Sequence, residues 1–182
     1  MSIKEDSFMV LTEIPLTLPE DLVTGCCPKF HPGQWEEKIY DFSAYQFIKS
    51  HTNSLFYMPL NMSKVMTKVS SDIEAAKANH KDRFLILSQD VSAFKCEHYF
   101  LVNGEVPGYK PQKITDRYFC KVYDGPFKNI STWMKDFDEV LRLKGRNLKE
   151  VFTYYTTCPE CAKVYNHNYV VLLAKVDNEF EL

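Results

Sequence analysis

Two pairs of cysteines are the residues of this sequence whose type and spacing could do chemistry. Cys158 and Cys161 enclose Pro-Glu between two strand-like runs, and Cys26 and Cys27 stand in the Gly- and Pro-rich segment 25–33. Thiols at this spacing can share a metal ion or close a redox disulfide. If the two pairs meet, they supply the four sulfur ligands of a tetrahedral zinc site that ties the N-terminal loop to the last hairpin. Adjacent cysteines point to opposite sides of a strand, so Cys26 and Cys27 can bind the same ion only in a turn.

Three interpretations of the cysteines remain open. In the first, zinc is held by all four thiols, or by three of them with His31 or His167 as the fourth ligand. In the second, Cys158 and Cys161 form a redox dithiol whose reactivity depends on the thiol pKa, although no helix is expected after the motif. In the third, the thiols are unmetallated, and the protein has no cofactor.

The composition narrows the class of protein. The 182 residues are enough for a real core, and aromatic residues are 14% of the chain, which favours a thick β core or an aromatic-lined pocket. A net charge of −2 argues against nucleic acid and anionic membrane as partners and leaves a small-molecule ligand. Residues 1–8 carry acids and no apolar stretch, so no signal peptide is predicted. We therefore expect a cytoplasmic monomer or homodimer, in which cysteines stay reduced or bind metal.

The elements that must position these groups follow a pattern that occurs twice. Residues 1–40 are predicted to be an N-terminal extension with a cysteine-bearing loop that packs on the domain, and residues 41–182 form the domain itself. Apolar residues at helical spacing predict helices over 61–78 and 129–144. Alternating or apolar runs predict strands over 41–49, 54–60, 84–89, 97–103, 116–123, 148–157 and 167–176.

This pattern predicts an α+β fold built from a tandem strand-helix-strand-strand repeat. Repeat one spans about residues 41–104, and repeat two spans about residues 115–176. Neither sheet alone is wide enough to cover its helix, so the two copies are expected to merge into one antiparallel sheet with two helices on one face. The opposite face should then be concave and partly open, with a ligand cleft between the halves.

One signature carries a family resemblance. Tyr123-Asp124-Gly125-Pro126-Phe127 leads into a Trp-bearing helix, and a strand with Tyr154 and Tyr155 follows it. Over roughly residues 40–176 the chain resembles the GyrI-like small-molecule-binding domain, also called the bacterial effector-binding domain. It also resembles a stand-alone subgroup often labelled "hydrolase", through the segments 26–30, 58–61 and 154–163.

The resemblance implies a cleft that binds flat, hydrophobic and often cationic compounds, with aromatic rings stacked on the ligand and a buried acid to balance its charge. Some members of the family hydrolyse strained cyclopropane rings of DNA-alkylating natural products. One departure matters: Thr153 stands where the family places a glutamate. Glu160 in the Cys-Pro-Glu-Cys turn and Glu97 at the start of a strand are the candidates to replace it.

The predicted site residues follow from this alignment and from strand parity. Thr153 and Tyr155 are expected to face the cleft, while Phe152 and Tyr154 pack on the helices. Candidate catalytic residues are Tyr155, Glu97 and Glu160. Candidate ligand-binding residues are Phe56, Tyr99, Thr153, Tyr155 and Trp35, of which Trp35 could instead close the edge of the domain.

The sequence thus predicts a protein that binds hydrophobic or aromatic small molecules, with a detoxifying hydrolase activity as an extension of that role. Two alternatives come from other classes. One is a zinc-stabilised or thiol-redox protein in which the cysteines carry the function. The other is a non-enzymatic protein that binds a partner through a sheet edge or the acidic tail 177–182.

Overall fold

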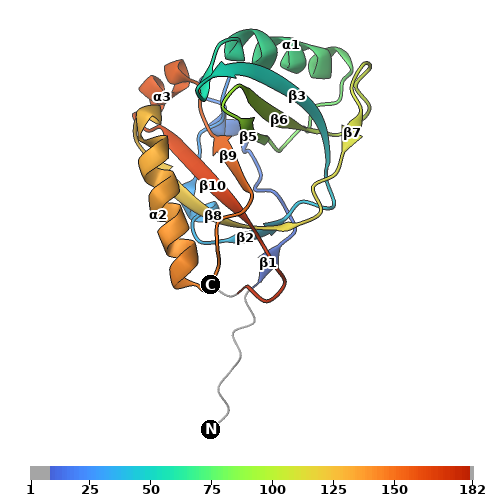
Figure 1. Ribbon diagram of the computed structural model, residues 1–182. Helices are drawn as coiled ribbons and strands as arrows, with labels where there is room; N and C mark the ends of the chain where they lie inside the picture. Colours follow the sequence, from blue (N-terminus) through green and yellow to red (C-terminus); the bar gives the residue numbers. More distant parts are fainter. Residues whose placement is uncertain (1–8, 181–182) are drawn as a thin grey trace.

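A computed structural model describes residues 9–180 of the chain (Figure 1). Residues 1–8, on which the prediction about a signal peptide rests, lie outside this range. The last two residues of the acidic tail lie outside it as well. The strands are β1 (Val10–Leu11), β2 (Ile39–Asp41), β3 (Gln46–Leu55), β4 (Met58–Pro59), β5 (Ile86–Ser92), β6 (Lys95–Val102), β7 (Pro111–Gln112), β8 (Arg117–Asp124), β9 (Val151–Tyr155) and β10 (Tyr169–Val176). The helices are α1 (Met62–Ala75), α2 (Ile130–Leu143) and α3 (Pro159–Tyr165).

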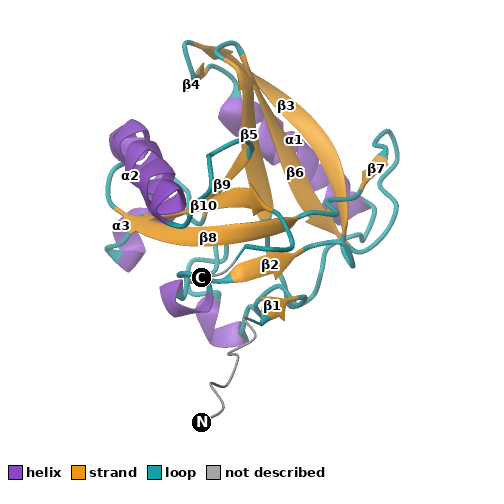
Figure 2. Ribbon diagram, turned by 60° about the horizontal axis from the view of Figure 1, so that its bottom comes forward, coloured by secondary structure: helices purple, strands orange, loops and turns teal. Residues whose placement is uncertain are grey.

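The strands form one large, mostly antiparallel open sheet, so the α+β class is correct. Its order is β1-β2-β8-β10-β9-β5-β6-β3-β4, and β7 pairs with β3 (Figures 1 and 2). The run β3-α1-β5-β6 has the spatial strand order β5-β6-β3, and the run β8-α2-β9-β10 has the order β9-β10-β8. In each run the last strand lies between the other two. The runs meet where Ser88 of β5 pairs with Thr153 of β9, and we call this line the seam.

The first half of the sheet departs from the predicted strands. Two strands were expected over 41–49 and 54–60, but β3 is a single strand of 10 residues, and only two residues of β4 follow its turn. The Asp41 end of the first predicted strand belongs to β2, which pairs with β8 in the other half. A turn in which the amide of Tyr45 donates to the carbonyl of Phe42 separates β2 from β3.

The two long helices lie where their apolar stripes predicted them. Val69 and Ile73 of α1 are buried against a cluster with Ile48 and Phe100, while Trp133, Phe137 and Leu141 of α2 are buried against a cluster with Phe119 and Leu172. Side chains alternate between the two faces of a strand, and paired residues of neighbouring strands point to the same face. Followed strand by strand across the seam, the pairing puts all of these sheet residues on one face, so both helices cover that face. Gly145 ends α2 with a φ of +72°, as expected for the residue after a helix C-cap.

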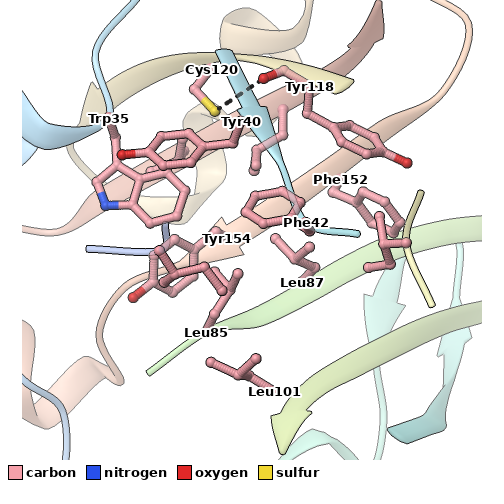
Figure 3. Close-up of a cluster of buried hydrophobic side chains, with 14 of the residues drawn as sticks. Trp35, Tyr40, Phe42, Leu85, Leu87, Leu101, Tyr118, Cys120, Phe152 and Tyr154 are labelled. Carbon is pink, nitrogen blue, oxygen red and sulfur yellow. Dashed lines mark hydrogen bonds between the residues drawn. The ribbon is translucent and has the colours of Figure 1, made fainter. Parts of the chain in front are cut away.

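The other face of the sheet is filled rather than open, which corrects the predicted concave hollow there. The N-terminal segment, residues 12–38, crosses this face and contributes Ile14 and Trp35 to a buried cluster. Its other members include Tyr40, Phe42, Tyr118, Phe152 and Tyr154 (Figure 3). A cavity between Phe30, Trp35 and Tyr154 measures about 30 Å³. Ligand pockets for drug-sized molecules measure roughly 300–1,000 Å³, so this space holds water at most.

The cysteine motif near the C-terminus begins a helix, which the sequence analysis missed. Cys158 is the N-cap residue of α3, Pro159 is its first residue, and Asn166 ends it in the left-handed conformation. Seven residues are too few for a periodic apolar stripe, so the motif was taken for a hairpin turn. No helix within residues 9–180 is long and apolar enough to cross a membrane.

Candidate functional site

The four cysteines of the two pairs come together at one place. The Sγ atoms of Cys26, Cys27, Cys158 and Cys161 all lie within 4.8 Å of one another, so these residues could hold a metal ion. Segment 23–27 is a turn followed by a bend, the geometry that two adjacent ligands require. His31 instead lies 2.7 Å from the carboxylate of Asp21, and His167 lies 2.6 Å from that of Asp124. Neither histidine belongs to the metal-binding group, which consists of four thiols.

The surroundings of the cluster act differently on its individual thiols. The amide of Cys158 donates to the Sγ of Cys27 at 3.3 Å, and the Sγ of Cys161 lies 3.2 Å from the Oγ1 of Thr24. Burial raises the pKa of Cys27, and on its own it would also raise that of Cys161. Hydrogen bonds with Thr24, the Cys27 backbone and neighbouring thiols outweigh burial at Cys161 and lower its pKa to about 7. The pKa is thus lowered at Cys161, whereas burial raises it at Cys26 and Cys27.

A second group of polar residues lies on the helix-bearing face. Thr52, Ser88, His98 and Thr153 are buried there beside the seam, and we call them the polar row. The Nδ1 of His98 is 2.8 Å from the Oγ of Ser88, and its Nε2 is 2.9 Å from the Oγ1 of Thr52. Burial lowers the pKa of His98 to about 4, so the imidazole is neutral at pH 7. The row separates the apolar cluster under α1 from the one under α2, and burying polar groups costs free energy that apolar residues would not.

Ionisable groups and aromatic rings lie next to this row on the same face, and we call this place the outer end of the polar row. Asp90 and Cys96 are cross-strand partners, and Cys96 is paired on its other side with Thr52. Asp90 is an exposed residue, but partial desolvation of its carboxyl still raises its pKa. Burial, followed by the charge of Asp90, raises the pKa of Tyr155, so this phenol keeps its proton. The ring of Phe127 packs edge-on against Tyr155, with 5.5 Å between ring centroids.

The turn between β3 and β4 adds an exposed apolar rim. Phe56 and Tyr57 both have positive φ, 47° and 68°, where glycine or asparagine would be the usual residues of a two-residue hairpin turn. Phe56 is 71% exposed, and its ring lies 5.8 Å from that of Phe94. Strained residues of this kind gather at sites of function more often than elsewhere.

The structure divides the predicted ligand-binding residues between the two faces. Thr153 and Tyr155 lie on the helix-bearing face, and Phe152 and Tyr154 pack under the N-terminal segment, which reverses the predicted packing of that second pair. Trp35 is only 3% exposed in the aromatic cluster, where it closes the sheet face. Tyr99 also packs against this cluster, edge-on to Phe152. Of the five, Thr153 belongs to the polar row, Tyr155 lies on the same face, and Phe56 is exposed in the turn after β3.

The three predicted catalytic residues do not converge. Glu97 lies on the face opposite Tyr155 and forms ion pairs with Lys95 at 2.8 Å and Lys49 at 3.1 Å. Glu160 is exposed on α3, where it pairs with Lys163. Asp90 is an acid whose charge reaches Tyr155 in the folded sheet, and sequence analysis missed it because nothing local to β5 distinguishes it.

The ion pairs of Glu97 predict a defined pH dependence of stability. Burial would raise its pKa, but hydrogen bonds and charge interactions with Lys95 and Lys49 outweigh this and lower it. A lowered pKa in the folded state contributes stability that is present above the unfolded-state pKa and is lost as the pH falls through the folded-state value. We expect Glu97→Gln to lower the free energy of unfolding at pH 7, with the difference from wild type vanishing in acid. Urea unfolding of both proteins from pH 7 to pH 3 measures this, and a difference that does not change with pH would contradict it.

The comparisons with known proteins agree with part of the sequence analysis. A protein-family model described as "Bacterial hydrolase" matches residues 18–176. No curated protein and no solved structure matches the chain. The matched range runs from the N-terminal segment to the end of β10 and contains both cysteine pairs, the polar row and Tyr155. Because this match covers most of the chain, the protein belongs to the bacterial hydrolase family.

Proposed function

We propose that the protein binds hydrophobic, aromatic and cationic small molecules at the outer end of the polar row and hydrolyses a reactive member of this class. The observation that carries the proposal is a set of polar groups, including Asp90 and Tyr155, on a sheet face otherwise packed with apolar side chains. The family's description as a hydrolase is compatible with turnover.

We further propose that the fold is a GyrI-like tandem repeat. Two features support this. Both strand-helix-strand-strand runs have the same strand order, and they join through the second strand of each run. In this proposal the ligand cleft lies on the helix-bearing face at the seam, because the N-terminal segment occupies the opposite face.

The residues at the seam have complementary roles in the proposal. Asp90 stands in for the family's glutamate and, as a carboxylate, attracts a cationic ligand or accepts a proton from water as the water oxygen attacks. Tyr155 remains protonated, so its phenol can donate to the leaving group. Thr153 lies beside it, and Phe56, Phe94 and Phe127 supply rings for stacking.

As a cofactor we propose one structural zinc ion on the four cysteines. Four sulfur ligands close the coordination shell of zinc and leave no position for a substrate, so the ion would stabilise the fold and not take part in hydrolysis.

Titration with the planar cation rhodamine 6G tests the binding site. We expect fluorescence anisotropy to rise and saturate, and we expect Phe56→Ala to weaken binding, because it removes an exposed ring at the rim. Leu143→Ala is the matched control, since Leu143 is 83% exposed at the far end of α2 and should not affect binding. A lack of saturable binding across rhodamine 6G and a panel of other planar cations would overturn the proposed function.

A further inference from the structure

The N-terminal segment covers an aromatic surface with little regular structure of its own. Between β1 and β2, residues 12–38 contain only two three-residue 3₁₀ helices. Ordering the backbone costs roughly 1–2 kcal/mol per residue, and strandless segments of this length are uncommon in compact domains. The segment nevertheless buries Ile14 and Trp35 against the sheet. Something must offset the entropy lost in holding it there.

Few backbone hydrogen bonds join this segment to the rest of the chain. The amide of Thr17 donates to the carbonyl of Asp82 at 2.8 Å near one end, and that of Glu37 donates to the carbonyl of Cys120 at 3.0 Å near the other. Cys26 and Cys27 lie between these two points, at the bend of the segment. The four-cysteine cluster is therefore placed where, within residues 9–180, no backbone–backbone hydrogen bond joins the segment to the rest of the chain.

The opposite half of the cluster is firmly built into the domain. Cys158 and Cys161 belong to α3, which connects the adjacent strands β9 and β10. Tyr165 of the same helix donates to the carbonyl of Cys27 at 2.8 Å. This contact and the bond from the Cys158 amide to the Cys27 sulfur direct the segment onto α3.

The distances between the sulfur atoms suit zinc. Zinc–sulfur bonds of about 2.3 Å in a tetrahedron place the sulfur atoms about 3.8 Å apart. The Sγ atoms of Cys26 and Cys27 are 3.6 Å apart, and all four lie within 4.8 Å. Bringing four thiols together without an ion has no evident packing benefit, because Cys26 is exposed and Cys158 is half-buried.

We propose that zinc on these four cysteines is a clasp that holds residues 12–38 across the aromatic face, and that its removal releases this segment while the two helices and the central sheet stay folded. This inference rests on the proposed zinc ion. It adds that the ion stabilises one segment locally and is not needed for the rest of the domain.

Metal content tests the ion itself. Protein purified without added metal should contain about one zinc per chain by elemental analysis, and Co²⁺ exchanged into the site should give the intense visible absorption of a tetrahedral thiolate complex. We expect Cys161→Ser to lose nearly all of this metal. Cys120→Ala, which changes a buried thiol outside the cluster, should retain it. Absence of zinc with no uptake of Co²⁺ would overturn the zinc ion and the clasp together, and a disulfide between Cys158 and Cys161 in that protein would favour the thiol-redox alternative.

The two tryptophans test the clasp separately. Trp35 lies in the segment, and Trp133 lies on α2, stacked on Tyr123. In Trp133→Phe protein, a zinc chelator should shift the emission of Trp35 to the red, and limited proteolysis should then cut within residues 12–38. In Trp35→Phe protein the emission of Trp133 should not change. If zinc is present but its removal leaves Trp35 unchanged, the clasp is wrong and the zinc site stands, and a simultaneous shift of Trp133 would show that the ion supports the whole domain.

Discussion

Replacing Trp35 with alanine is expected to lower the free energy of unfolding by about 3–5 kcal/mol, the usual cost of truncating a buried aromatic residue. The indole is 3% exposed and packs against Tyr40 at 4.7 Å and Tyr154 at 5.4 Å between ring centroids. Removing it leaves a cavity between the N-terminal segment and the sheet. Urea unfolding followed by circular dichroism measures the loss, because this signal does not depend on the tryptophan.

The same experiment separates the two roles considered for Trp35. Phe56→Ala is the matched control, since Phe56 is an aromatic candidate of the same kind but is largely exposed. Its loss should change the free energy of unfolding by no more than about 0.5 kcal/mol. If Trp35→Ala were as stable as the wild type and instead abolished binding of rhodamine 6G, Trp35 would be a ligand contact and not part of the core.

Replacing Asp90 with asparagine is expected to weaken the binding of rhodamine 6G by about 10- to 150-fold. This range corresponds to the roughly 1.5–3 kcal/mol contributed by a hydrogen bond to a charged group. Asparagine keeps the size of the side chain and removes only its charge. Isothermal titration at pH 7 compares the two proteins.

The pH dependence of binding identifies the charge involved. A carboxylate binds a cation only above its own pKa, and the pKa of Asp90 is raised from its ordinary value of 3.8. Wild-type affinity should therefore be full at neutral pH and fall on acidification before an ordinary surface aspartate would be protonated, whereas Asp90→Asn should bind weakly at every pH. Glu97→Gln is the control, because Glu97 lies on the other face. Equal affinities of Asp90→Asn and wild type would remove Asp90 from the site.

Local patterns in the sequence were sufficient to predict the two long helices and the cysteine cluster. The apolar stripes of α1 and α2 are periodic over 14 residues each, so no distant contact is needed to recognise them. A site shared by the four cysteines was one of three open interpretations, and their sulfur atoms lie close enough together for it. This interpretation came from the type of residue, because two pairs of thiols in turns can together supply the four ligands of a zinc ion.

Features that depend on distant contacts could not be predicted in the same way. Segment 12–38 has no periodic pattern, so the sequence offered a place for Trp35 at the domain edge but did not indicate which sheet face it would close. The polar row is assembled from four strands, and its members look like ordinary strand residues until the register is known. Asp90 is a single acid near the end of β5, and its charge acts on Tyr155 only in the folded sheet.

The spacing of the cysteines along the chain also affects how the protein is made. Cys27 and Cys158 are 131 positions apart, so the first pair leaves the ribosome long before the second is synthesised. Until then the apolar side chains of residues 12–38, such as Ile14 and Trp35, have no complete sheet to pack against, and exposed apolar surface of this kind makes a nascent chain prone to aggregate. If zinc forms the proposed clasp, the last step of maturation waits for α3 and for the metal supply of the cell, and chains made under zinc starvation should accumulate as substrates for chaperones and proteases.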